Sequence, residues 1–189
     1  MSDKISQTME NDAPLSAAKN PDTDHIAGGE ASLVGRTVTI NRPRDEVYAY
    51  WRDLRNLPSF MENVEAVRII DDRVSHWTVA APAGQSVEWD SIIVEDDPGR
   101  VIAWKSSQDA AIPNSGRIEF RDSPVGRGTE VTATILYDPP AGTAGKLVAK
   151  LFQKEPNIQA RRELRRFKQL METGEVSTAK PPHAAPRAE

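Results

Sequence analysis

The single histidine between residues 33 and 174, His76, is the side chain best suited to move a proton at neutral pH. It lies in a stretch whose apolar residues alternate, with Trp77 and Val79 on one side. In a β-strand this alternation places His76 on the opposite, outer face together with Thr78. We therefore interpret His76 as a solvated surface histidine rather than as a general base.

Two carboxylates, Glu88 and Asp90, flank Trp89. A pair of carboxyl groups can divide acid and base roles when their environments differ. Alternation again places both on the outer face, where Lys105 of the next predicted strand is a plausible partner. Opposite charges across a strand pair contribute only about 0.2–1 kcal/mol. We interpret these residues as part of a charged outer ladder.

Aromatic residues dominate the predicted inner face, where Trp77, Trp89 and Trp104 come from three consecutive strands. They form either plain core packing or the wall of a pocket. We find no ionisable acid–base pair on this face, whose polar candidates are Tyr137, Ser91 and Ser106. Tyr137 would be the acid–base group if the protein is an enzyme. The expected ligand-lining residues are Phe60, Trp77, Trp89, Trp104, Ile118, Phe120, Ile135, Tyr137, Leu151 and Phe152.

The sequence offers few residues for thiol, metal or phosphate-binding chemistry. The chain has no cysteine, which excludes disulfides, zinc–thiolate sites and thiol nucleophiles. Gly126-Arg127-Gly128 is better explained as a hairpin turn than as a phosphate-binding loop. We expect neither a metal site nor a cofactor.

Seven segments have the alternating pattern of β-strands, and turn residues separate the last six. Parallel neighbours would need crossover connections of about a dozen residues, so the short links predict an antiparallel sheet. The predicted strands are Val34–Ile40, Val64–Ile70, Ser75–Ala81, Ser86–Glu95, Arg100–Ser106, Gly116–Asp122 and Thr129–Tyr137.

Helical spacing appears on both sides of these strands. A helix starting at Pro43 carries an apolar stripe through Val47 and Trp51, and Pro58 directs the chain into a short second helix. The strongest stripe is near the C-terminus and ends at Gly174. It begins after Pro156, which suits a first helical position. Its members are Ala160, Leu164, Phe167 and Met171.

The stretch before Pro156 has apolar residues at helical spacing beside Lys146, Lys150 and Lys154. One interpretation is a segment packed over the sheet edge with solvated lysines. The other is a lid that docks on anionic lipid and opens a cavity. Its apolar residues are Leu147, Val148, Leu151 and Phe152.

The composition predicts one folded domain at residues 33–174. Residues 1–32 and 175–189 hold few large apolar side chains, and we expect both to be disordered tails. No stretch approaches the ~20 apolar residues that span a bilayer, so we expect a cytoplasmic protein, with peripheral contact at the inner membrane if the lid docks there.

Several local motifs resemble one protein family. They are residues 43–51 (PRDEVYAYW), residues 57–60 (LPSF), residues 87–90 (VEWD), Pro98-Gly99 before Ile102-Ala103-Trp104, and residues 126–129 (GRGT). With the order of elements, they resemble the START-like (SRPBCC) helix-grip superfamily, and within it bacterial polyketide cyclase/dehydrase-type members that include coenzyme Q-binding proteins. The resemblance implies an α+β fold in which a curved sheet wraps a long C-terminal helix around a cavity for an apolar ligand.

Three functions remain open at this point. The first is non-catalytic binding or carriage of a quinone, isoprenoid or lipid. The second is a polyketide aromatase/cyclase or dehydratase. The third is ribosome or RNA association through the basic C-terminal stretch, which has +6 between Lys146 and Lys168 in a chain of net charge −4. That stretch lacks interleaved aromatics for base stacking, so we do not expect nucleic acid as a partner.

Overall fold

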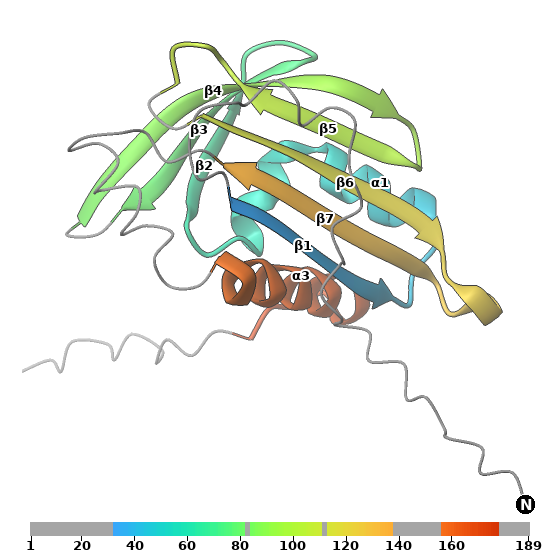
Figure 1. Ribbon diagram of the computed structural model, residues 1–189. Helices are drawn as coiled ribbons and strands as arrows, with labels where there is room; N and C mark the ends of the chain where they lie inside the picture. Colours follow the sequence, from blue (N-terminus) through green and yellow to red (C-terminus); the bar gives the residue numbers. More distant parts are fainter. Residues whose placement is uncertain (1–31, 82–83, 111–112, 138–155, 178–189) are drawn as a thin grey trace, which may run out of the picture.

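The computed structural model of the protein describes residues 32–81, 84–110, 113–137 and 156–177 (Figure 1). The lysines and apolar residues of the expected lid (Lys146, Leu147, Lys150, Leu151, Phe152 and Lys154) lie outside these ranges, and so do nearly all of the two expected tails.

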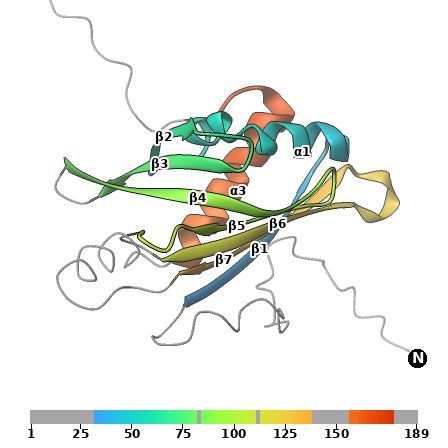
Figure 2. The same cartoon turned by 90° about the horizontal axis from the view of Figure 1, so that it is seen from above.

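Seven antiparallel strands form one curled sheet, as the turn spacing predicts (Figures 1 and 2). Neighbouring strands in space are mostly neighbours in sequence, apart from β1, which pairs with β7 and places β2 at the far edge. The strands are β1 (Ser32–Ile40), β2 (Val64–Ile69), β3 (Val74–Ala81), β4 (Gln85–Asp97), β5 (Val101–Ser106), β6 (Asn114–Asp122) and β7 (Thr129–Tyr137).

Between β1 and β2 the chain forms helix α1 (Arg44–Arg52) and the 3-10 helix η2 (Leu54–Ser59). Helix α1 begins one residue after Pro43, and η2 contains Pro58 instead of starting after it. The tighter 3-10 turn ends where the N–H groups of Phe60 and Met61 both donate to the Leu57 carbonyl, at 3.1 and 2.9 Å. A short 3-10 helix, η4 (Pro124–Gly126), connects β6 to β7.

Helix α3 (Pro156–Thr173) lies against the inner side of the sheet (Figure 2). It begins at Pro156 as expected, and Gly174 ends it with a φ of 79° and an N–H bond of 2.8 Å to the Leu170 carbonyl. The four residues of the predicted apolar stripe are all buried, which confirms the face that the helical spacing indicated.

The C-terminal end of α3 is tied to the chain that leaves β1. Arg42 donates from Nε to the Met171 carbonyl at 2.7 Å and from Nη2 to the Glu172 carbonyl at 3.1 Å. The last carbonyls of a helix have no partner within it and carry its negative dipole end, so a guanidinium suits them. Arg42 therefore caps the C-terminal end of α3 and joins it to the segment after β1.

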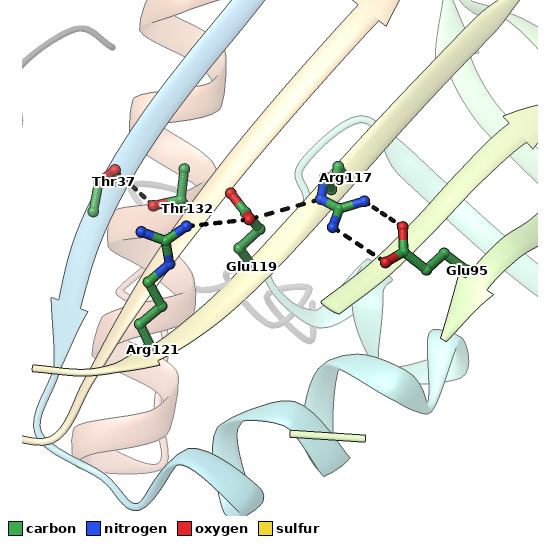
Figure 3. A network of polar contacts seen from close by, with 6 residues as sticks. All are labelled: Thr37, Glu95, Arg117, Glu119, Arg121 and Thr132. Carbon is green, nitrogen blue, oxygen red and sulfur yellow. Dashed lines mark hydrogen bonds and ion pairs between the residues drawn. The ribbon is translucent and has the colours of Figure 1, made fainter. Parts of the chain in front are cut away.

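The sheet face opposite α3 carries a ladder of charges (Figure 3). Alternation predicts this for the β6 residues, whereas Glu95 joins the ladder because the pairing of β4 with β5 shifts register between Ile93 and Glu95. Arg117 on β6 pairs with Glu95 on β4, and its Nε lies 3.7 Å from Oε1 of Glu119, which Arg121 contacts at 3.4 Å. Alongside, the hydroxyls of Thr37 and Thr132 are hydrogen-bonded at 2.9 Å. Exposed pairs of this kind stabilise a fold by only about 0–1 kcal/mol each.

Candidate functional site

A cavity of about 150 Å³ lies between the inner face of the sheet and α3. Strands β3 to β7, η2 and the first turns of α3 supply most of its walls. All four tryptophans of the chain line it, since Trp51 of α1 joins the three expected from the strands. Trp51 carries no signal that separates it from an ordinary core residue, because its position in a helical stripe predicts burial only.

The strand tryptophans are held by cross-strand contacts. Trp77 and Trp89 face each other in the register of β3 and β4, with ring planes 8° apart and centroids 6.4 Å apart. The indole N–H of Trp77 donates to the hydroxyl of buried Ser75 at 3.0 Å. This bond satisfies a polar group that would otherwise be costly beside an apolar cavity.

The other expected lining residues separate into three groups. Ile118 and Ile135 line the cavity, as does Ser91. Phe60 and Phe120 are buried in the packed core and are not among the lining residues. The side chain of Tyr137, like Leu151 and Phe152, lies outside the part of the chain that the structure describes.

Phe60 belongs to an aromatic cluster that anchors α3 to the helices between β1 and β2. Its ring centroid lies 4.7 Å from that of Phe167 and 5.2 Å from that of Trp51. Phe167 in turn meets Trp51 edge to face at 5.0 Å. Trp51 thus touches the packed core on one side and the cavity on the other.

Glu163 of α3 also lines the cavity. The sequence-based search for ionisable groups covered the inner face of the strands and did not include the helix opposite them. Oε1 of Glu163 accepts a hydrogen bond from Nε2 of Gln159, one turn earlier, at 3.1 Å. Burial raises the pKa of Glu163 to about 7, an effect that Gln159 and Arg166 partly oppose and Glu62 reinforces. A carboxyl group with this pKa is present in both protonation states near neutral pH.

The helical spacing of the sequence places Glu163 beside the buried face of α3. Glu163 lies about 40° from Phe167 around the helix axis, at the edge of the apolar stripe. Charged residues at such edges usually extend to solvent, so the sequence alone does not distinguish Glu163 from a surface glutamate.

His76 lies away from the cavity, on the outer side of β3. Its Nδ1 is 2.7 Å from Oδ1 of Asp90 and its Nε2 is 3.7 Å from Oε2 of Glu88. The partner of these carboxylates is therefore His76, opposite Asp90 in the register, while Lys105 is opposite Ile92. The Thr78 hydroxyl donates to Oε1 of Glu88 at 3.2 Å, so these side chains form one polar network on the outer face.

A second polar group fixes α1 against β4. Asp96 accepts hydrogen bonds from the Tyr48 hydroxyl and, at 2.6 Å, from Nε of Arg52. Burial, followed by the Asp96 hydrogen bond, raises the pKa of Tyr48 to about 12. Tyr48 is thus a neutral structural donor over the physiological pH range.

Within the described ranges, no group of three or more His, Asp or Glu side chains comes together as a set of metal ligands. No helix there is long and apolar enough to cross a membrane.

A protein-family model for polyketide cyclase/dehydrase and lipid transport proteins matches residues 40–165. The chain belongs to this family. The match begins at the last residue of β1, covers β2 to β7 in full and ends inside α3, and it confirms the resemblance to polyketide cyclase/dehydrase-type proteins that the local motifs indicated.

Several solved structures share the fold. A Deinococcus radiodurans protein is 40% identical over 76% of this chain and 99% of its own, with a TM-score of 0.62. A Thermus thermophilus protein is 24% identical over 74% of this chain and 97% of its own, with a TM-score of 0.61. The Zhui aromatase/cyclase from a Streptomyces species is 19% identical over 78% of this chain and 99% of its own, with a TM-score of 0.59.

A 17.2 kDa protein of Streptomyces lincolnensis is 30% identical over 73 residues. This alignment spans 39% of the present chain and 48% of that protein.

Proposed function

We propose that this protein binds a hydrophobic small molecule, of the quinone, isoprenoid or lipid class, in the cavity between the sheet and α3. The observation that carries the proposal is the wall of four tryptophans around about 150 Å³ of space. Small-molecule sites are typically apolar with a few polar groups that fix orientation. The lining has this composition, and the family description includes lipid transport.

The cavity volume limits the size of the ligand. An engineered cavity of about 150 Å³ in another protein binds benzene, whereas pockets for drug-sized ligands reach about 300–1,000 Å³. The cavity therefore suits one ring or a short branched chain, and the rest of a longer ligand would extend beyond it. This favours a molecule with a compact head over a multi-ring polyketide held entirely inside.

Titration with ethylbenzene, followed by NMR of the tryptophan indole N–H groups, tests the proposal. Ala133→Leu adds bulk inside the cavity, while Thr132→Leu adds similar bulk on the outer face. We expect ethylbenzene to shift the indole signals of the wild type and the Thr132→Leu variant but not those of Ala133→Leu. Absence of shifts in the wild type, with no apolar molecule recovered by extraction of the purified protein, would refute the proposal.

A second candidate is an acid–base enzyme acting on polyketide-like intermediates, and the carboxyl group of Glu163 in the cavity favours it. A general acid or base works best when its pKa is near the operating pH. Turnover of a polyketide intermediate by the wild type, lost in Glu163→Gln with binding retained, would support catalysis. Tyr137 stays a second predicted acid–base residue.

A further inference from the structure

Glu163 is the one ionisable residue among the described residues that line the cavity. Asn63, Ser91, Asn114 and Gln159 supply the other polar side chains of the lining. A carboxyl group with tryptophan and aliphatic neighbours is a strong hydrogen-bonding group in a site of low polarity, where each polar contact has more weight than in water.

The charges around Glu163 do not fix it as a carboxylate. Glu62, in the segment after η2, is acidic, and Nη1 of Arg162 lies 2.8 Å from Oε2 of Glu62. Arg162 and Arg166 on α3 itself favour the ionised form and lower the pKa of Glu163, but burial outweighs both and the pKa stays raised. The residues that β3 to β7 contribute to the lining carry no ionisable side chain.

The contact with Gln159 orients the carboxyl group. The amide Nε2 donates to Oε1 of Glu163, so Oε2 is the oxygen left to carry a proton in the neutral form. A neutral carboxyl group donates one hydrogen bond through that proton. Its matching ligand group is an uncharged acceptor oxygen.

Resting on the proposed function, we propose that neutral Glu163 donates a hydrogen bond to a carbonyl oxygen of the bound ligand. The ligand class is then an uncharged ring compound with a ketone or quinone-type oxygen. An amine would require two buried charges in a largely apolar wall, which costs more than one neutral hydrogen bond.

Three compounds of nearly equal size test this inference: acetophenone with a carbonyl, ethylbenzene without one, and 1-phenylethylamine with an ammonium group. Each is titrated at about pH 5.5 and about pH 8.5, well below and above the pKa of about 7 that burial gives Glu163. Only about 3% of Glu163 is neutral at the higher pH, so the affinity for acetophenone should fall by up to about 30-fold, the limit reached when the ionised form does not bind it. Ethylbenzene should bind equally at both.

Three variants distinguish the effect of the Glu163 carboxyl group on binding from the effect of the cavity itself. Glu163→Gln keeps a neutral donor, so acetophenone should bind it with no dependence on pH. Glu163→Leu removes the donor, so acetophenone should bind no better than ethylbenzene. Glu175→Gln, a change at an exposed position after α3, should keep the full pH dependence of the wild type.

The outcomes distinguish this inference from the proposed function. If ethylbenzene fails to bind at either pH, the binding function itself is wrong. If ethylbenzene binds but acetophenone shows no pH dependence, or if 1-phenylethylamine binds more tightly at the higher pH than acetophenone does at the lower, the carbonyl assignment is overturned and the cavity remains a binding site.

Discussion

The ring of Trp104 lies over the backbone of Gly116, its direct neighbour in the register of β5 and β6. A Cβ atom at residue 116 would be within 2.7 Å of three carbons of that ring, closer than carbon atoms approach in folded proteins. Glycine at this position therefore allows Trp104 to form part of the cavity wall.

Gly116→Ala should destabilise the protein by about 1–3 kcal/mol, because overpacking forces a neighbouring side chain or the backbone to move. Urea unfolding measures the free energy. In a Trp104→Leu background the same change should cost much less, since the overlapping ring is gone. Equal losses in both backgrounds would show that Gly116 acts through the strand backbone instead.

The stability of the ligand-free protein should depend on Glu163 near neutral pH. Its pKa is about 7 in the folded state against 4.5 for an ordinary glutamate, so between these values the folded state binds more protons than the unfolded state. The free energy of unfolding should therefore fall as pH rises from about 4.5 to 7, by up to about 3 kcal/mol from this group.

Urea unfolding of the wild type and of Glu163→Gln at several pH values measures this contribution. The variant should lose the fall in stability and be the more stable protein above neutral pH, while Glu175→Gln should follow the wild type. If wild type and Glu163→Gln show parallel pH profiles, Glu163 is solvated and its carboxyl group is not held in the cavity.

Phe167 should be among the most costly core residues to truncate, since it packs against Phe60 and Trp51 at once. We expect Phe167→Ala to lower the free energy of unfolding by about 3–5 kcal/mol. Thermal or urea unfolding measures the loss. A loss no larger than that of Leu170→Ala, at a half-buried position on the same helix, would contradict the anchoring role.

Arg42→Met should cost about 1.5–3 kcal/mol, because it removes charged hydrogen bonds to the last carbonyls of α3. Arg44→Met is the matched control. Arg44 makes a 3.0 Å ion pair with Asp122, whose side chain is 72% exposed, so its loss should cost under about 1 kcal/mol. Similar costs for both variants would show that the Arg42 bonds do not anchor α3.

The sequence determined the elements of this fold because their signals are local. Alternation in Trp77–Val79 or Arg117–Arg121 requires only that one face of a strand be buried, and short turns between strands leave antiparallel pairing as the available arrangement. The stripe from Ala160 to Met171, bounded by Pro156 and Gly174, likewise follows from the geometry of a single helix.

Only the tertiary structure decided where two buried faces pack against each other and where they leave a cavity between them. Phe60 and Trp77 both have inward positions, yet one is closed into the core by Phe167 and the other borders the cavity. Glu163 has the pattern of a surface residue, and only the position of α3 over the sheet turns it inward. A periodic pattern reports the direction of a side chain, whereas a cavity depends on the distance between two faces, which is set by contacts far apart in the chain.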